Sequence, residues 1–337
     1  MIPKSAPSVQ VEPWQQALSS AFRNLGSLHA WLGLEAPDAT AGRSAEDFPL
    51  LVTRHFAGLM ERGNPNDPLL RQVLPLAAEQ TPVSGFDTDP LNERDFSDQG
   101  LVRKYAGRAL WIMTGGCPVH CRYCFRRHFP YAEHALGPRR IDSALERVAA
   151  DPSISEVILS GGDPLIVADE HLKSICARLS AIPHVRRLRI HTRVLTTLPQ
   201  RITPTLIEAL AGFRGALVVV THINHAQEIA PETRAACAEL RAAGAQLLNQ
   251  SVLLARVNNA TPVLKALSEA LIDAGIQPYY LHLLDRVAGA AHFEVDEPEA
   301  QKLMAELTDQ ISGYMLPTLV REEPGARAKT RVPPPPD

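Results

Sequence analysis

The sequence predicts an α/β fold in which a partial, TIM-like (β/α)6 barrel follows an N-terminal helical region and precedes a C-terminal loop. From about residue 106, short apolar runs of strand length alternate with segments of helical periodicity. This alternation is typical of a parallel sheet with helices packed outside it. Six such runs are fewer than the eight strands of a complete TIM barrel, so we expect a partial one.

The N-terminal region, expected over residues 1–105, is helical. Trp14, Leu18, Phe22 and Leu25 recur at the spacing of one helix face, and a further helix is expected over residues 48–62. Residues 83–98 are polar and irregular, and we expect them to cross over to the barrel.

The barrel is expected over residues 106–295. Its predicted strands cover residues 109–114, 156–160, 187–191, 217–222, 246–253 and 279–284. The predicted helices cover residues 143–150, 169–181, 205–211, 231–243 and 262–274. Gly212, Gly244 and Gly275 follow three of these helices, where glycine commonly ends a helix. Residues 296–337 should hold a helix, a buried strand within 313–320, a loop and a disordered proline tail.

Composition narrows the class of protein. The chain has 337 residues, 45% apolar content and a net charge of −3, which suit a globular protein without a basic surface for nucleic acid. The N-terminus lacks an apolar signal core, and no apolar stretch is long enough for a membrane span. We therefore expect a cytoplasmic protein without nucleic-acid or membrane partners.

The most informative motif is a C-x3-C-x2-C run formed by Cys117, Cys121 and Cys124. Thiolates hold iron–sulfur clusters, and three of them bind three irons of a [4Fe–4S] cluster while leaving the fourth iron open. An open iron can chelate S-adenosylmethionine (SAM), so the run resembles the radical SAM superfamily. A zinc site with His120 as its fourth ligand and a disulfide framework are the weaker alternatives. The other two cysteines, at 176 and 237, fit small buried apolar side chains.

Polar and glycine residues follow the predicted strands, where parallel barrels gather their chemistry. The loop after the second strand can bring backbone close to SAM and offer a carboxylate to its ammonium, although an ordinary turn is the alternative. Arg193 and His222, after the third and fourth strands, are candidates for the ribose or carboxylate of SAM, or else structural. Polar residues 249–251 are expected to point into the barrel. The glycine-rich loop consists of Ser160, Gly161, Gly162 and Asp163.

These motifs together resemble lysine 2,3-aminomutase over roughly residues 50–331. The resembling segments, in chain order, are 62–75, 117–127, 160–165, 221–225, 249–254, 279–285 and the loop around Lys329. The resemblance implies an isomerase that moves the α-amino group of L-lysine to the β-carbon. It also implies three cofactors: a [4Fe–4S] cluster, SAM and pyridoxal 5′-phosphate.

The resemblance assigns roles to single residues. Lys329 matches the catalytic lysine that binds pyridoxal phosphate covalently in the C-terminal cofactor-binding loop, and Arg108 matches the arginine that grips its phosphate. Arg126 matches the residue that holds the substrate α-carboxylate. Asp285 matches one of two carboxylates that receive the ε-ammonium of lysine. The second is an aspartate in the family, and Glu322 stands at its position here.

The chain also departs from the longer family members, because it ends eight residues after Lys329. It therefore resembles the short branch that supplies (R)-β-lysine for modification of elongation factor P. We expect no structural zinc and a weakened or absent oligomer. The implied partners are a flavodoxin- or ferredoxin-type reductant and a ligase that takes over the product.

Two other functions stay open at this point. One is a radical SAM 2,3-aminomutase acting on another amino acid such as glutamate, although Asp285 and Glu322 would repel an acidic side chain. The other is a protein without aminomutase activity. It would either use the cluster for a different reaction without pyridoxal phosphate, or be a non-catalytic iron–sulfur or zinc protein that binds a partner or nucleic acid through its arginines.

Overall fold

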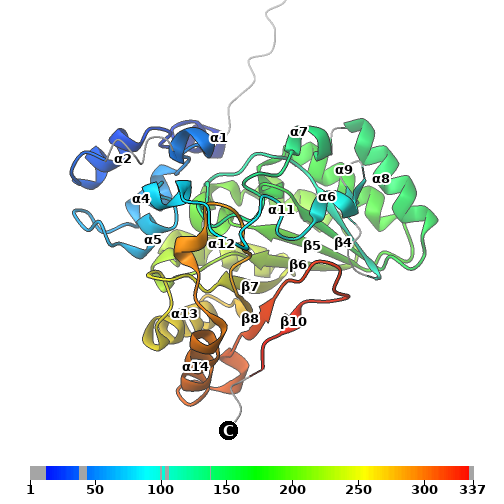
Figure 1. Cartoon of the computed structure of the whole chain (residues 1–337). Helices are drawn as coiled ribbons and strands as arrows, with labels where there is room; N and C mark the ends of the chain where they lie inside the picture. The colour runs from blue at the N-terminus through cyan, green and yellow to red at the C-terminus, as the bar shows by residue number, and fades with distance from the viewer. Residues whose placement is uncertain (1–12, 38–43, 99–100, 103–105, 137, 334–337) are drawn as a thin grey trace, which may run out of the picture.

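The computed structural model describes residues 13–37, 44–98, 101–102, 106–136 and 138–333. One twisted sheet forms its centre, with helices on its outer side (Figure 1). The strands follow one another in chain order, from β1 at one edge to β10 at the other, and the sheet does not close on itself. Among the described residues, no helix is both long and apolar enough to cross a bilayer.

The strands from β3 to β9 pair in parallel and form the curved wall of the partial barrel. All six predicted strands are present with ends within two residues of expectation, and β9 adds a seventh parallel strand. Short antiparallel strands cover both edges: β1 (Ser97–Asp98) and β2 (Leu101–Val102) at one, and β10 (Thr330–Arg331) at the other. The parallel strands are β3 (Arg108–Ile112), β4 (Glu156–Ser160), β5 (Arg187–Thr192), β6 (Ala216–Thr221), β7 (Gln246–Val252), β8 (Gln277–His282) and β9 (Thr318–Arg321).

Six helices of at least eight residues connect or flank these strands. Proline at the first turn begins several of them, because its fixed φ suits that position. Thr203 caps one of them by accepting a hydrogen bond from the backbone N–H of Leu206. The helices are α8 (Pro138–Ala150), α9 (Asp169–Ser180), α11 (Pro204–Ala211), α12 (Pro231–Ala242), α13 (Thr261–Asp273) and α14 (Glu297–Thr308).

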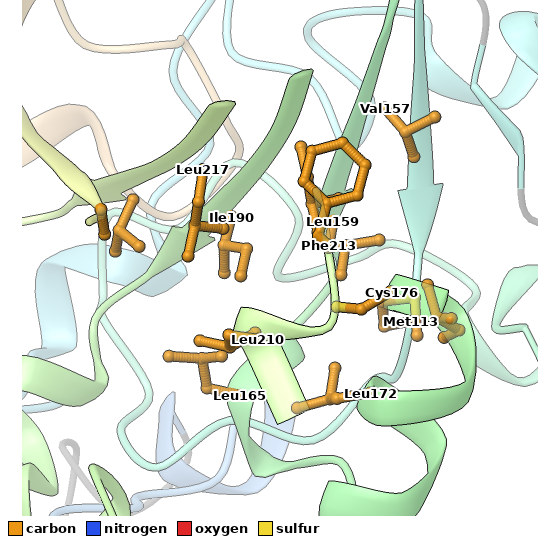
Figure 2. Packing of buried hydrophobic residues seen from close by; sticks show 14 of the residues in the cluster. Met113, Val157, Leu159, Leu165, Leu172, Cys176, Ile190, Leu210, Phe213 and Leu217 are labelled. Carbon is orange, nitrogen blue, oxygen red and sulfur yellow. The ribbon is translucent and has the colours of Figure 1, made fainter. Parts of the chain in front are cut away.

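The two faces of the sheet differ in polarity. Leu188 and Ile190 of β5 are fully buried against the helices, while Arg189 and His191 between them face the inside of the barrel. Figure 2 shows the apolar side, where Leu159 and Ile190 lie close to residues of α9 and α11 such as Leu172 and Leu210. This outer core holds the sheet, and the inner face is left for polar side chains.

The N-terminal region forms short helices rather than long ones: α1 (Pro13–Ser19), α2 (Leu25–Leu32), α4 (Arg54–Gly58) and α5 (Pro68–Arg71). The helix predicted over residues 48–62 is wrong in extent. Val52 pairs with Phe22 in an isolated β-bridge, and Thr53 caps the helix that starts at Arg54, so the chain before it is extended. The prolines at 334–336, expected to be disordered, lie outside the described residues.

Candidate active site

A cavity of about 230 Å³ opens at the carboxyl ends of the parallel strands. Of the residues predicted to be functional, only Arg108 and Glu322 are outside its lining. The cavity thus brings together predicted functional residues that lie as far apart in the chain as positions 117 and 329. The predicted residues that line the cavity are Cys117, Cys121, Cys124, Arg126, Ser160, Gly161, Gly162, Asp163, Arg193, His222, Asp285 and Lys329.

A larger hollow of about 670 Å³ lies beside this cavity and shares Asp285 with it. Glu322 lines the larger hollow together with other carboxylates, such as Asp87 and Glu294. No cysteine lines it, so we place the chemistry in the smaller cavity. The two carboxylates predicted to receive an ammonium therefore lie where both hollows meet.

The three cysteines of the motif are free thiols that face the cavity. Burial raises the pKa of Cys124 to about 11 and that of Cys117 well above its usual value, so binding metal must expel their protons. Among the described residues, no three His, Cys, Asp or Glu side chains come close enough to hold a single metal ion. A four-iron cluster does not need the three sulfurs around one ion, because each cysteine binds a different iron. Cys176 and Cys237 are fully buried in the outer core, as predicted.

The glycine-rich loop packs directly on the cysteine loop. The N–H of Gly162 donates to the carbonyl of Thr114 at 2.7 Å, and the N–H of Asp163 donates to the carbonyl of Gly116 at 2.8 Å. A Cβ on Gly162 would lie 1.9 Å from the oxygen of Gly116, and Gly161 has a φ of +122°. Glycine is therefore required by contact between the two loops.

The side chain of Asp163 joins two strand ends. Its carboxylate accepts hydrogen bonds from the Thr192 hydroxyl and from the backbone N–H of Arg193, at 2.8 and 2.7 Å. Burial raises its pKa to about 6, although these hydrogen bonds oppose the shift. Its predicted contact with the SAM ammonium stays a prediction.

The N-terminal region holds the cysteine loop through ion pairs, hydrogen bonds and a ring contact. The fully buried Arg122 donates from Nε to Glu79 at 2.8 Å and also to backbone carbonyls of residues 44 and 48. Arg127 donates to the same carboxylate at 2.7 Å. His120 stacks on Phe48, and its Nδ1 lies 2.7 Å from the carbonyl oxygen of Pro49. These contacts position the loop that carries the thiols.

Arg126 is buried and forms a two-pronged ion pair with Glu93, through Nε at 2.6 Å and an Nη at 2.9 Å. Its other Nη donates to the Ser160 hydroxyl at 2.9 Å and to the Gly161 carbonyl at 3.3 Å. A carboxylate thus already occupies the guanidinium predicted to bind the substrate carboxylate.

Lys329 enters the cavity from the loop between β9 and β10. Pairing of Thr330 with Arg321 returns the chain to the sheet, which holds the loop in place. The Lys329 ammonium forms an ion pair with Glu322 and lies 5.8 Å from the ring centroid of Tyr280. Glu322 therefore binds an ammonium group in this structure, that of Lys329.

Two histidines, His191 on β5 and His282 on β8, face the same space. Burial lowers the pKa of His191 and of His282 well below the usual value, and the charge of Lys329 adds to both shifts. The Nε2 atoms of both rings are buried without a hydrogen-bond partner among the described residues. The two neutral imidazoles, the Lys329 ammonium and the Gln250 amide thus give this part of the cavity polar edges.

Two predictions about the barrel interior need correction or qualification. Asn249 and Ser251 face the helices rather than the interior, because side chains alternate along β7; of the three polar residues, Gln250 alone lines the cavity. Arg108 lies at the opposite end of β3 from the cysteine loop and does not line the cavity. Its predicted phosphate contact stays a prediction.

Several cavity residues were not predicted from the sequence. The Tyr123 hydroxyl lies 2.9 Å from Nε2 of His222, and both residues line the cavity. Glu93 lies in a segment expected to be irregular, and nothing local in the sequence marks it. His282 carries a detectable signal, because it alternates with Tyr280 at the carboxyl end of a predicted strand.

Comparisons with known proteins agree with this geometry. The sequence pattern of the Radical SAM superfamily matches residues 111–250. An L-lysine 2,3-aminomutase of Escherichia coli is 49% identical over 321 residues, which cover 95% of this chain and 94% of the relative. The protein of the same name from Haemophilus influenzae is 42% identical over 332 residues and 98% of each chain. That of Acetoanaerobium sticklandii is 36% identical over 325 residues, or 95% of this chain and 78% of the relative.

Proposed function

The chain belongs to the lysine 2,3-aminomutase family of radical SAM isomerases, and from this premise we propose that it converts L-lysine to (R)-β-lysine with pyridoxal phosphate as a further cofactor. One observation carries the proposal: a single cavity brings together three cysteines, the glycine-rich loop, Asp285 and Lys329. Few other reactions need thiolates and a reactive amine around one substrate.

The bound groups supply the difficult chemistry: a reduced cluster provides the electron that cleaves SAM to a radical, and pyridoxal phosphate supports the migrating nitrogen. Cys117, Cys121 and Cys124 would hold the cluster. The backbone of residues 160–163 and the ring of His222 line the space next to it and would bind SAM.

Lys329 would hold pyridoxal phosphate, with Arg108 as the proposed phosphate ligand. The ion pair with Glu322 keeps the Lys329 ammonium inside the cavity until the cofactor arrives. His191 and His282 are neutral and have unfilled Nε2 positions there, which supports an occupant with polar edges.

The substrate would be held at both ends, by Arg126 on the carboxylate and by Asp285 and Glu322 on the ammonium. For Arg126 to bind a carboxylate through two hydrogen bonds, it must release some of its present contacts with Glu93, Ser160 or Gly161. Clamping both ends fixes one C–H bond next to the radical, and positioning of this kind is worth about 7–11 kcal/mol of barrier.

The biological setting is part of the proposal. We infer a cytoplasmic enzyme that receives electrons from a flavodoxin- or ferredoxin-type protein and whose β-lysine is attached to elongation factor P by a ligase. Transfer of the enzymatic product onto purified elongation factor P by such a ligase would test it.

The direct test uses protein reconstituted with iron and sulfide without oxygen. Incubation with lysine, SAM and dithionite should give β-lysine, and glutamate in place of lysine should give no β-amino acid. Borohydride reduction with pyridoxal phosphate should leave a stable adduct that peptide mapping places on Lys329. Absence of both the product and the adduct would refute the proposal.

A substitution at Asp285 tests the clamp. Asp285→Ala removes a carboxylate from the ammonium end, so we expect kcat/KM for lysine to fall at least 100-fold, equivalent to about 3 kcal/mol. Iron and sulfide content should stay at the wild-type level, because Asp285 lines the same cavity but is not one of the proposed cluster ligands. Unchanged lysine turnover would contradict the assignment.

A further inference from the structure

The guanidinium of Arg193 contacts a cysteine of the motif. Arg193 follows β5 and is buried, with one Nη 2.6 Å from the Cys121 sulfur and 2.8 Å from the Tyr123 hydroxyl. Its second Nη lies 2.6 Å from Oε1 of Gln72 and 3.2 Å from Oε2 of Glu228. The charge of Arg193 is thus directed at a ligand sulfur.

The surrounding residues hold this guanidinium in place. The carboxylate of Asp163 fixes the backbone N–H of Arg193 at 2.7 Å, and the Phe56 ring lies 5.2 Å from the guanidinium carbon. Glu228 is fully buried and accepts a hydrogen bond from the backbone N–H of Asn224 at 3.0 Å. The carboxylate that balances the charge of Arg193 is therefore fixed as well. A fixed cation and a fixed anion produce a constant field at Cys121.

We propose that Arg193, through its contact with the Cys121 sulfur, raises the reduction potential of the cluster, and that Glu228 limits this effect. The proposal rests on the proposed function only in that the three cysteines hold a [4Fe–4S] cluster. Hydrogen bonds to cluster sulfurs and the net charge around them set the potential, because reduction adds one electron to the cluster. Arg193 then tunes the cluster through a ligand, in addition to any contact with SAM.

The test measures the cluster directly, without lysine or pyridoxal phosphate. Reconstituted wild-type and variant proteins are titrated with dithionite and redox mediators, and the paramagnetic signal of the reduced cluster gives the midpoint potential. Arg193→Gln should shift the potential to a more negative value, and Arg193→Lys should shift it less. Glu228→Gln should shift it in the opposite, positive direction, because it removes the anion that offsets Arg193.

Arg127→Gln is the matched control. It removes the same charge near the same loop, but Arg127 donates to the Arg122 carbonyl and to Glu79 and not to a cysteine sulfur. Its shift should be smaller than that of Arg193→Gln, and equal shifts would overturn the contact with Cys121 as the cause.

Iron and sulfide content separates the possible failures. A wild-type protein without a cluster on the three cysteines overturns the proposed function itself. Wild-type content and potential in Arg193→Gln overturn the inference alone. If Arg193→Gln does not load, Arg193→Lys and Glu228→Gln decide, and a zero or negative shift in Glu228→Gln overturns the inference.

Discussion

At the scale of single residues, the cavity keeps its histidine side chains neutral. Burial, with the charge of Arg193 acting in the same direction, lowers the pKa of His222 to about 3. The ring accepts or donates one hydrogen bond, to the Tyr123 hydroxyl. In the unfolded chain the same imidazole has a pKa of about 6.5, so the unfolded state binds the proton first as the pH falls.

This difference predicts a pH-dependent loss of stability. Between about pH 6.5 and pH 3, His222 should reduce the free energy of unfolding as the pH falls, by at most about 1.4 kcal/mol per pH unit. Urea unfolding of the apoprotein at pH 7, 5 and 4 should therefore show a shallower pH dependence in His222→Gln. His171→Gln, on the exposed face of α9, should follow the wild type. The same slope in His222→Gln and the wild type would contradict the prediction.

The sequence identifies residues whose partners are close in the chain. The spacing of Cys117, Cys121 and Cys124 identifies them as cluster ligands, because the ligands of one cluster fit within a short loop. Glu93 and Glu228 do not, since each becomes informative only when folding brings a distant arginine to it. A buried counter-ion has no local pattern, and for this reason the site was predicted only in part.

At the scale of elements, a buried triad attaches the cysteine loop to the N-terminal region. Glu79 neutralises both Arg122 and Arg127, and all three side chains are at most 3% exposed. Removal of a shared buried anion leaves two cations without their partner, which is far more costly than loss of an exposed pair.

Glu79→Ala should lower the free energy of unfolding by about 3–5 kcal/mol. Glu208→Ala removes a comparable ion pair, with Lys173, in which both side chains are more than half exposed, and should cost about 0–1 kcal/mol. Urea unfolding of the two variants measures the contrast. Equal effects would show that the triad does not fasten the loop.

A second element-scale prediction concerns the contact between the glycine-rich and cysteine loops. Gly162→Ala places a methyl group 1.9 Å from the Gly116 carbonyl oxygen, so the loops must separate. We expect iron and sulfide content after reconstitution to fall severalfold. Gly244→Ala adds the same methyl group where nothing lies within 4 Å, and its φ of +87° makes it a control for backbone strain alone. Full cluster loading in Gly162→Ala would contradict this account.

The strands were predictable because strands of a parallel sheet leave short apolar runs between segments of helical periodicity. The helix expected over residues 48–62 was not, because apolar residues there serve a bridge from Val52 to Phe22 and only a short helix after Thr53. Tertiary pairing overrode a local helical pattern at this point. Short elements are the least determined by their own sequence.

At the scale of the whole molecule, the site depends on the sheet from end to end. The thiols follow β3, and Lys329 precedes β10 at the opposite edge (Figure 1). The two groups are delivered by separate parts of the fold, since Val332 packs into a C-terminal core cluster that contains no cysteine of the motif. We therefore expect the two cofactor functions to be separable.

A truncation tests this separation. Deletion of residues 330–337 removes β10 and the Val332 anchor but keeps Lys329, and it should reduce the borohydride-trapped adduct at least tenfold. Iron and sulfide content and dithionite-driven SAM cleavage should stay near wild type. Deletion of residues 334–337 alone is the control and should leave both functions intact. Parallel loss of both functions in the longer deletion would show that the sheet folds as one unit with the loop.

The unclosed sheet has one more consequence. In a closed barrel, strand number and stagger fix the radius, so the diameter of the bore cannot follow its contents. Here two short antiparallel ribbons end the wall, and no hydrogen-bond ring has to break when its curvature changes. The aperture can therefore widen to admit bulky reactants and then tighten around them. The open sheet can thus adjust its curvature to the molecules it encloses, which a closed barrel could not do.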